Sequence, residues 1–145
     1  MMKVNIKKLN ENAVIPTYAK DGDAGMDMVA TRIINETLDS ITYGTDIAVE
    51  IPDGFVGLVF PRSSIRKTNL HLSNSVGVID SGYRGELQAT FKKIQGISNN
   101  TLDNYKVGDR IFQLMIIPHP TIQFIEVDEL TNTERGEGGF GSTGK

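Results

Sequence analysis

The feature of this sequence that most restricts its fold is a series of short apolar or β-branched runs separated by turn residues. The runs have the alternation and the length of β-strands. Glycine, proline, asparagine and aspartate separate them, as in Pro52-Asp53-Gly54 and Ser81-Gly82, and no segment has a convincing helical repeat. We expect strands at residues 4–9, 45–51, 55–60, 75–79, 86–91, 110–117 and 122–127.

Strands without intervening helices predict an all-β fold, because only sheet-on-sheet packing buries their inward faces. A chain of 145 residues has room for one core. The hydrophobic fraction of 39% is slightly low, which is compatible with a small β protein that hides further surface in an oligomer. The last eleven residues, RGEGGFGSTGK, contain five glycines and cannot pack a core. We therefore expect a single domain at 1–134 and a flexible arm at 135–145.

The composition excludes several classes of function. The chain has no cysteine, and its two histidines, His71 and His119, are too few for a histidine-based zinc centre. A net charge of -3 argues against a general nucleic-acid surface, so any phosphate binding must be local. No apolar run has the length of a signal peptide or a membrane span. We expect a soluble, cytoplasmic protein that binds neither nucleic acid nor membrane.

Five stretches carry the candidate chemistry: AGMDMVA (24–30), PRSS (61–64), GVIDSGYRGE (77–86), GDRIFQLMI (108–116) and RGEGGFGSTG (135–144). Their order and spacing resemble the five motifs of the trimeric dUTPases. The resemblance implies a distorted jelly-roll β-barrel and a homotrimer whose active sites are shared between subunits. It also implies hydrolysis of dUTP to dUMP and pyrophosphate, which limits uracil incorporation into DNA and supplies dUMP for thymidylate synthesis.

The third motif is interpreted as a β-hairpin, with a strand to Ile79, a turn at Ser81-Gly82 and a return from Tyr83. Asp80 then lies where the hairpin bends. From the residues alone, a turn aspartate that bonds its own backbone is the favoured reading. The resemblance instead implies that Asp80 is the general base, which orients and deprotonates the water that attacks the α-phosphorus.

The same motif is expected to bind the nucleoside. By resemblance, the backbone of Gly77, Val78 and Ile79 hydrogen-bonds the uracil edge, and Asn74 assists through a water molecule. Tyr83 resembles the residue whose ring lies under the deoxyribose and leaves no space for a 2′-hydroxyl. Its alternative role is cross-strand packing.

In the second motif, Pro61 is expected to end a strand, and Arg62, Ser63 and Ser64 follow on a turn. Successive backbone N–H groups there can form an anion nest. Arg62 adds a charge-assisted fork, and Ser63 can donate to the oxygen between the α- and β-phosphates. Ser64 stands where many members of the family have glycine, and it still supplies its N–H. The neighbouring Arg66 and Lys67 are interpreted as solvated loop charges.

In the fourth motif, alternation predicts Ile111 and Gln113 on one face of a strand, with Arg110 and Phe112 on the other. The resemblance makes Gln113 an α-phosphate ligand. Arg110 belongs either to the phosphate field or to a structural ion pair. Asp27 is either a group near the magnesium or a support for the active-site wall, and we favour support. Mg²⁺ is expected as cofactor, held mainly by the substrate phosphates without direct protein ligands.

The glycine-rich tail read in isolation is a disordered segment. By resemblance it is a flap in which Phe140 stacks over the uracil and Arg135 meets the γ-phosphate. Gly141, Ser142 and Thr143 are expected to add backbone and hydroxyl contacts. Ordering such a tail costs roughly 1 to 2 kcal/mol per residue, so we expect it to close only on substrate.

The sequence leaves two rival functions open. One is the dCTP deaminase branch, which shares the jelly-roll architecture, although the tail GGFGSTG favours hydrolysis. The other is a binding module in which nucleotide occupancy controls association with a protein partner. The chain also departs from the family pattern at Gly82, where many members have an acidic residue before the tyrosine.

Overall fold

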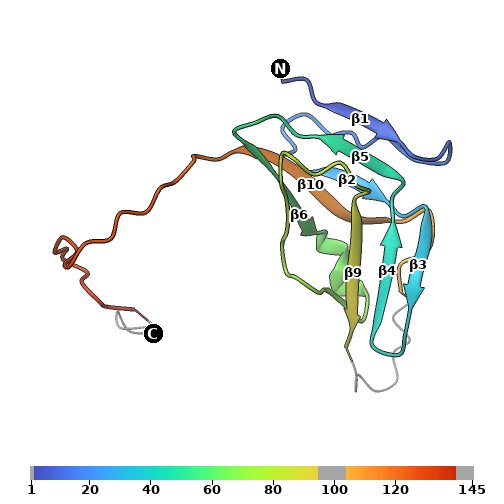
Figure 1. The fold of residues 1–145 in the computed structure, drawn as a ribbon. Coiled ribbons are helices and arrows are strands. Elements are labelled where there is room, and N and C mark those ends of the chain that lie inside the picture. Colours follow the sequence, from blue (N-terminus) through green and yellow to red (C-terminus); the bar gives the residue numbers. More distant parts are fainter. Residues whose placement is uncertain (1, 95–103, 140–145) are drawn as a thin grey trace.

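The computed structural model describes residues 2–94 and 104–139. Within them the chain forms ten β-strands and one short 3-10 helix (Figure 1). The strands are β1 (Asn5–Lys8), β2 (Met26–Val29), β3 (Arg32–Glu36), β4 (Ser40–Gly44), β5 (Ile47–Glu50), β6 (Phe55–Pro61), β7 (Leu70–Leu72), β8 (Gly77–Ile79), β9 (Gln88–Lys93) and β10 (Arg110–Pro118), and the helix is η1 (Ser63–Lys67).

Two four-stranded antiparallel sheets build the body of the domain. One has the strand order β2-β10-β6-β8, and the other has the order β3-β4-β9-β7. A two-stranded sheet, β1-β5, lies beside them. Apart from β3 and β4, the paired strands are not neighbours in sequence, and the chain crosses repeatedly between the sheets, which is the arrangement of a distorted jelly roll. The expected all-β class is confirmed.

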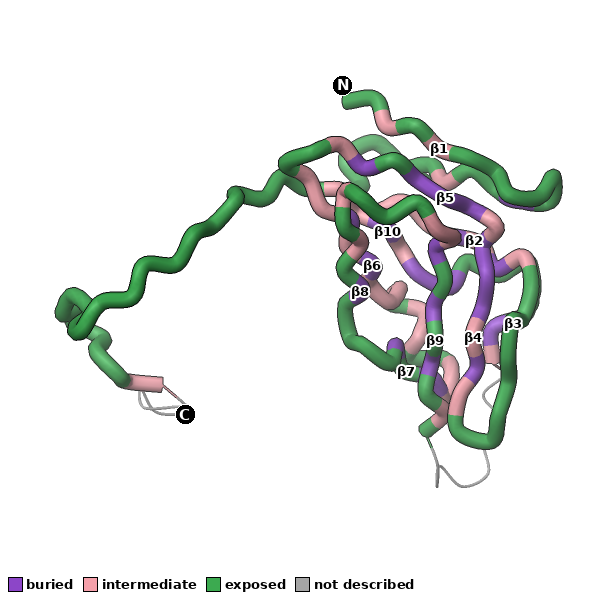
Figure 2. The backbone as a smooth tube through the Cα atoms, viewed as in Figure 1, coloured by how far each residue is buried: buried purple, intermediate pink, exposed green. Residues whose placement is uncertain are grey.

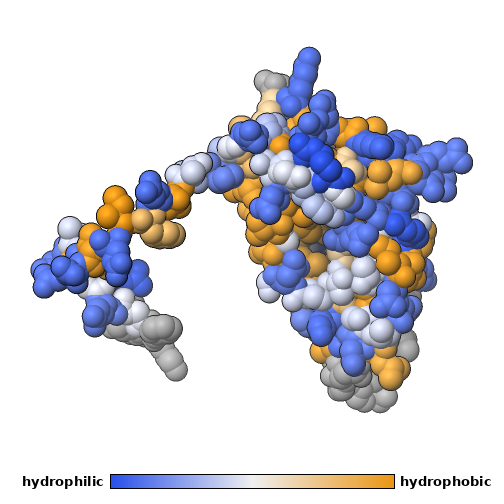
Figure 3. All heavy atoms as spheres, in the orientation of Figure 1, coloured by the Kyte–Doolittle hydropathy of each residue, from blue (hydrophilic) through white to orange (hydrophobic). Residues whose placement is uncertain are grey.

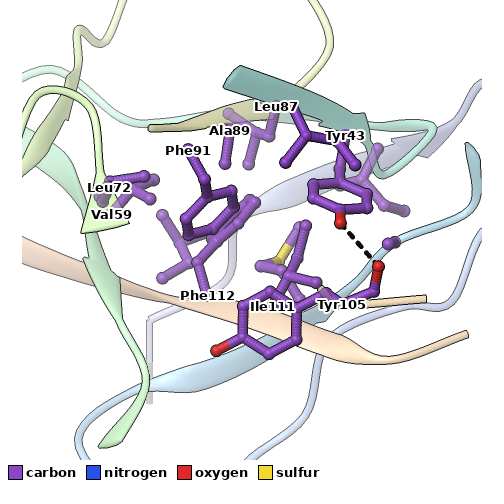
Figure 4. Packing of buried hydrophobic residues seen from close by; sticks show 14 of the residues in the cluster. Tyr43, Val59, Leu72, Leu87, Ala89, Phe91, Tyr105, Ile111 and Phe112 are labelled. Atoms are coloured by element: carbon purple, nitrogen blue, oxygen red, sulfur yellow. Dashed lines mark hydrogen bonds between the residues drawn. The ribbon is translucent and has the colours of Figure 1, made fainter. Parts of the chain in front are cut away.

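The core lies between the two large sheets, because the inward side chains of both meet there (Figure 4). Phe91 of β9 contacts Tyr43 edge-on at a ring distance of 5.9 Å and Tyr105 at 5.7 Å. Such edge-to-face pairs stabilise a core beyond the burial of their area. Tyr43 Oη donates a hydrogen bond of 2.6 Å to the backbone oxygen of Tyr105, so the only polar atom of this ring is satisfied. Phe112 of β10 lies in the same cluster and is fully buried.

Six of the seven expected strands overlap an observed strand, but residues 122–127 form none. That segment is extended and exposed, with Phe124 at 92% relative exposure, because a single chain offers its apolar side chains no partner. The chain leaves the body after β10, as Figures 1 and 2 show. Apolar atoms lie exposed along this tail in Figure 3. The division at residue 134 stays a prediction.

The expected hairpin in the third motif is wrong. β8 pairs with β6, whereas β9 pairs with β4 and β7 in the other sheet. The segment between them is therefore a crossover from one sheet to the other, with a turn in which the Tyr83 N–H donates to the Asp80 carbonyl at 3.1 Å. Long-range pairing decides this topology, and a local turn pattern cannot reveal it.

Two local expectations also need correction. A register shift between Arg110 and Phe112 interrupts the alternation of β10, so Ile111 and Phe112 are both fully buried. Pro61 is the last residue of β6, as expected, but the residues after Arg62 form the 3-10 helix η1 and not the expected turn. In the part of the chain that the structure describes, no helix has the length and apolarity needed to cross a membrane.

Candidate active site

A cavity of about 380 Å³ opens beside β2, the end of β6 and β10. It is lined by Ala19, Asp23, Ala24, Gly25, Asp27, Arg62, Ser63, Arg110, Gln113 and Met115. The fold thus brings together Arg62, Ser63 and Gln113, which the sequence analysis assigned to the triphosphate. They meet because β10 pairs with β2 on one side and with β6 on the other. We call this space the polar cavity.

Arg62 is held in one orientation by four hydrogen bonds. Its Nε donates to Asp27 Oδ1 at 2.6 Å and its Nη2 to Asp27 Oδ2 at 3.1 Å. Its Nη1 donates to Ser64 Oγ at 3.1 Å and to the Arg110 carbonyl at 3.2 Å. A guanidinium has five N–H groups, so within the described residues one N–H of Nη2 is left for an anion. The Ser64 hydroxyl therefore braces Arg62, in addition to the N–H that the sequence analysis assigned to it.

Asp27 also accepts a hydrogen bond of 3.2 Å from Arg110 Nη1. One carboxylate, about four-fifths buried, thus serves two arginines. The side chain of Arg110 is more exposed than that of Arg62, and in the described part of the chain its remaining donors have no partner. Asp27 therefore supports the wall of the polar cavity by holding two arginines. Arg110 forms an ion pair with Asp27 and keeps other N–H groups without a partner in the described part of the chain.

Gln113 extends from the middle of β10, where it lies opposite Phe60 of β6 and Asp27 of β2. Its Nε2 donates to the Pro61 carbonyl at 3.2 Å. A Cβ at Gly25 would lie 2.5 Å from Gln113 Oε1, so only glycine at that position leaves room for this rotamer. The sequence analysis missed Gly25, because its role depends on a cross-strand contact that no local pattern reveals.

Ser63 begins η1 with an exposed side chain. Among residues 2–94 and 104–139, its hydroxyl makes no hydrogen bond, so it remains able to donate to a ligand in the cavity. Arg66 and Lys67, at the other end of η1, are exposed and do not line the polar cavity. Their exposure fits the interpretation that they are solvated loop charges.

A second cavity, of about 250 Å³, lies at the crossover that follows β8. It is lined by Val78, Ile79, Asp80, Tyr83, Glu86 and Gln88. The Asp80 side chain is exposed, and its carboxylate bonds no group of the described residues. The alternative of a carboxylate turned back onto its own backbone is therefore not what the structure has. A free carboxylate can accept a proton from a bound water.

Tyr83 lies across Gly85 in this second cavity. Its Oη donates to the Glu86 carbonyl at 3.0 Å, and a Cβ at Gly85 would lie 2.3 Å from that Oη. The ring is about half exposed. This exposure does not fit the alternative role in cross-strand packing, and part of Tyr83 is accessible from the second cavity.

β8 is an edge strand of its sheet among the described residues. Its backbone groups on the side away from β6 have no partner strand, and such groups can hydrogen-bond an extended ligand or a base edge. A cavity of about 190 Å³ beside β8 is lined in part by Asn74, Gly77, Val78 and Ile79. Gly77 is buried, whereas Val78 is exposed.

The two groups of candidate residues do not share one cavity in this chain. The polar cavity contains Arg62, Ser63 and Gln113, and the second cavity contains Asp80 and Tyr83. Arg135 lies in the extended tail, where its Nε donates only locally, to the Gly138 carbonyl at 2.9 Å. The expected tail contacts of Phe140, Gly141, Ser142 and Thr143 lie outside the described residues.

Glu86 is the residue of the second cavity that has the most charged and polar partners around its carboxylate in the described structure. Burial acts to raise the pKa of Glu86, but hydrogen bonds from Arg32, the Asp46 N–H and Gln88, with the charge of Arg32, outweigh it and lower the pKa below its ordinary value. The carboxylate is therefore ionised at neutral pH.

In the described ranges, no group of three or more His, Cys, Asp or Glu side chains could hold a metal ion.

Comparisons with known proteins match the chain to one family along nearly its whole length. A sequence model of the dUTPase family matches residues 11–144. The deoxyuridine 5'-triphosphate nucleotidohydrolase of Escherichia phage T5 is 42% identical over 146 residues, which covers 94% of this chain and 96% of that protein. The protein of the same name from Hydrogenobaculum sp. (strain Y04AAS1) is 37% identical over 146 residues and covers 99% of both.

Solved structures show the same likeness. A variant of the Staphylococcus bacteriophage 80alpha dUTPase with dUpNHpp has a TM-score of 0.85 and 32% identity, and the match covers 100% of both chains. A variant dUTPase from phage phi11 of S. aureus, with a structural Mg(II) ion, has a TM-score of 0.74 and 30% identity, covering 88% of this chain and 98% of that one.

Proposed function

The chain belongs to the dUTPase family, and we propose that it hydrolyses dUTP to dUMP and pyrophosphate by the attack of an Asp80-activated water on the α-phosphorus. It is a deoxyuridine triphosphate nucleotidohydrolase, so the dCTP deaminase alternative is wrong. One observation carries the mechanism. The Asp80 carboxylate is free in the second cavity, while Arg62, Ser63 and Gln113 line the polar cavity.

Asp80 acts as the general base. Its carboxylate takes a proton from the water as the water oxygen bonds to the α-phosphorus, and the bond from that phosphorus to the bridging oxygen breaks. Pyrophosphate leaves with the electron pair of that bond. A positioned base contributes about 10² to 10⁴ in rate. The exposed position of Asp80 and the absence of any competing partner among the described residues support this assignment.

The polar cavity binds the triphosphate. Phosphoryl transfer needs positioning and charge stabilisation more than covalent chemistry. Ser63 donates to the bridging oxygen between the α- and β-phosphates, where charge grows, and Gln113 binds the α-phosphate. Arg62 contributes its charge and its remaining N–H. Ser64 supplies its backbone N–H, while its hydroxyl braces Arg62.

The nucleoside binds against β8 and the crossover. The free backbone edge of Gly77, Val78 and Ile79 reads the uracil, with Asn74 assisting through a water, and an unmet hydrogen-bond pattern rejects cytosine. Tyr83 lies under the deoxyribose and excludes a 2′-hydroxyl. The exposure of Tyr83 at the second cavity and the edge position of β8 support both roles.

The active enzyme is a homotrimer with shared sites. Two features support this proposal. The catalytic and phosphate-binding residues line different cavities of one chain, so a complete site needs a second copy. The tail also exposes large apolar side chains that a stable monomer would not leave in water: Ile122, Phe124, Ile125, Val127 and Leu130.

The arm at 135–145 closes over the bound nucleotide of a neighbouring subunit. In this role Arg135 meets the γ-phosphate and Phe140 stacks on the uracil. Gly141, Ser142 and Thr143 add close contacts. In the described part of the arm, Arg135 has only a local hydrogen bond, so its guanidinium can turn to a ligand at little cost.

Mg²⁺ is the proposed cofactor, and it neutralises the triphosphate charge when bound. The substrate phosphates hold it, since the described residues offer no carboxylate cluster and Asp27 is engaged by two arginines. A relative with a structural Mg(II) ion agrees with the use of this metal in the family. In this proposal the reaction keeps uracil out of DNA and supplies dUMP for thymidylate synthesis. The proposed location of the enzyme is the cytoplasm.

Pyrophosphate release measured with dUTP, dCTP, dTTP and UTP tests the proposed function, with ammonia release measured in parallel. Rapid pyrophosphate release from dUTP alone is the expected result. Equal release from all four nucleotides would contradict the assigned nucleoside site, and ammonia release would contradict the reaction.

A further inference from the structure

Three charged side chains that the proposed mechanism does not use form a cluster beside the crossover that carries Tyr83, and one of them, Glu86, also lines the second cavity. Arg32 of β3 donates two hydrogen bonds to Glu86, from Nη1 to Oε1 at 2.8 Å and from Nη2 to Oε2 at 2.6 Å. Arg32 Nη1 also contacts the carboxylate of Asp46. The carboxylates of Glu86 and Asp46 are largely buried, at 9% and 13% exposure. We call these three residues the Arg32 cluster.

The surrounding backbone is shaped to admit this cluster. Asp46 has a positive φ of 54°, which is uncommon for a residue with a side chain, and it lets the Asp46 N–H donate to Glu86 Oε1 at 2.7 Å. Thr31 Oγ1 donates to Asp46 Oδ2 at 2.6 Å. A Cβ at Gly44 would lie 2.7 Å from Glu86 Oε1 and 2.8 Å from Arg32 Cζ, so glycine is needed there.

The main chain at Glu86 is fixed by further bonds to the connection between β4 and β5. Thr45 Oγ1 donates to the Leu87 carbonyl at 2.7 Å, and the Leu87 N–H donates to the Ile47 carbonyl at 2.8 Å. The carbonyl of Glu86 itself accepts the hydroxyl of Tyr83 at 3.0 Å. A continuous set of contacts therefore runs from the guanidinium of Arg32 to the ring of Tyr83.

We propose that the Arg32 cluster positions Tyr83, and that Arg32, Asp46 and Glu86 thereby determine how strictly the enzyme rejects ribonucleotides. The inference rests on the proposed function, because it takes Tyr83 to be the residue that excludes the 2′-hydroxyl. In this role the three residues act on Tyr83 and not on the substrate itself. They act by fixing the Glu86 carbonyl, which is the only hydrogen-bond partner of the Tyr83 hydroxyl among the described residues.

Steric rejection depends on the position of a ring to within a fraction of an ångström, since an added hydroxyl must find no space. Loosening the Glu86 carbonyl lets the ring move away from the sugar and admits UTP, while the triphosphate contacts stay as they are. The cluster is therefore expected to control the ratio of kcat/KM for dUTP to kcat/KM for UTP, which we call the sugar ratio.

The test compares the sugar ratio of the full-length enzyme with those of Glu86→Gln, Arg32→Ala and Arg32→Lys. Glu36→Gln is the matched control, because Glu36 forms a similar ion pair of 2.6 Å with Lys93 but does not contact the Tyr83 region. We expect the ratio to fall about tenfold in Glu86→Gln and Arg32→Ala, the scale of discrimination by a tight pocket. Arg32→Lys should recover part of it, and the control should keep the wild-type value.

Partial unfolding lowers the active fraction for both substrates equally and leaves the sugar ratio unchanged, so a purely structural role gives no change in the ratio. An unchanged ratio in Glu86→Gln and Arg32→Ala overturns the inference. Tyr83→Ala separates this failure from that of the proposed function. If Tyr83→Ala lowers the ratio but the cluster variants do not, only the cluster assignment is wrong; if none lowers it, the role of Tyr83 is wrong as well.

Coupling between the cluster and the ring gives a second measurement. Tyr83→Phe removes the hydroxyl that bonds the Glu86 carbonyl, so Glu86→Gln should change the ratio much less in that background than in the wild type. Equal effects in both backgrounds would mean that the cluster does not act through the Tyr83 hydroxyl.

Discussion

Asp27 and Arg62 form a bidentate ion pair, with Nε 2.6 Å from Oδ1 and Nη2 3.1 Å from Oδ2. The pair joins β2 to the end of β6 across β10, so it holds the second motif against the first. Because most of the donors of Arg62 are engaged, the residue organises the wall of the polar cavity and offers its charge to a ligand.

Replacing Asp27 with asparagine should disorder this wall. The variant Asp27→Asn keeps the shape of the side chain but loses the charge that holds Arg62 and Arg110. The free energy of unfolding should fall by about 1.5 to 3 kcal/mol, the scale of hydrogen bonds to charged groups. We expect kcat/KM for dUTP to fall about 10- to 100-fold. Urea denaturation and steady-state kinetics measure the two effects, and a variant with unchanged kinetics would contradict the role of the pair.

Alanine at Gly85 should displace the ring of Tyr83. Its Cβ would lie 2.3 Å from Tyr83 Oη, and the ring end can swing away without disturbing the core. The variant Gly85→Ala should therefore accept UTP more readily while its Tm stays near that of the wild type. Gly82→Ala is the control, because a Cβ there meets nothing within 4 Å. Similar UTP kinetics in the two variants would argue against a sugar-sensing position for Tyr83.

The hydroxyl of Tyr43 should make stability depend on alkaline pH. Burial raises the pKa of Tyr43 from 10.0 to about 12. The unfolded chain therefore releases this proton first as the pH rises, so the stability that Tyr43 contributes is complete below pH 10 and is lost toward pH 12. Tyr43→Phe lacks this dependence.

Tyr43→Phe also leaves the Tyr105 carbonyl without its donor, which should lower the free energy of unfolding at pH 7 by about 1 to 3 kcal/mol. Urea denaturation of both proteins at pH 7 and at intervals up to pH 11 measures the difference between them. The difference should shrink above pH 10, and a difference that stays constant with pH would show that the hydroxyl titrates normally.

Deletion of residues 135–145 should abolish most activity and leave assembly intact. In the described part of this arm, the Arg135 side chain bonds only the nearby Gly138 carbonyl, so the arm adds little to the body. Light scattering and pyrophosphate release measure the two properties. Phe124→Ser, in the exposed apolar part of the tail, is the complementary variant and is expected to weaken assembly. Dissociation caused by the short deletion would make the arm a structural element.

The sequence predicts those parts of the fold that have a local pattern. β6 and β10 have clear apolar runs, whereas β3 is exposed at all five residues and β7 has only three, so neither shows a usable pattern. Residues 122–127 have the pattern of a strand but no partner in one chain. The turn after β8 has the local pattern of a hairpin but is a crossover, because the turn residues do not determine which distant strand each flanking segment pairs with.

In the candidate site, too, the sequence predicts what belongs to a local motif and does not predict contacts between strands. Arg62, Ser63 and Gln113 could be assigned together through the motifs, and the fold does gather them in one cavity. Gly25 and the Arg32 cluster could not be found in this way. Their roles arise from contacts across strands, such as the space that Gly25 leaves for Gln113, and these depend on the register of β2 against β10.

The most direct measurement compares binding with turnover in Asp80→Asn. Binding is measured with the dUTP analogue dUpNHpp, which relatives bind, and turnover by pyrophosphate release from dUTP. Asparagine keeps the size of the side chain but cannot accept the proton of the water. If Asp80 is the base, the variant should bind the analogue with wild-type affinity and lose about 10²- to 10⁴-fold in kcat. Turnover near the wild-type rate would contradict the mechanism.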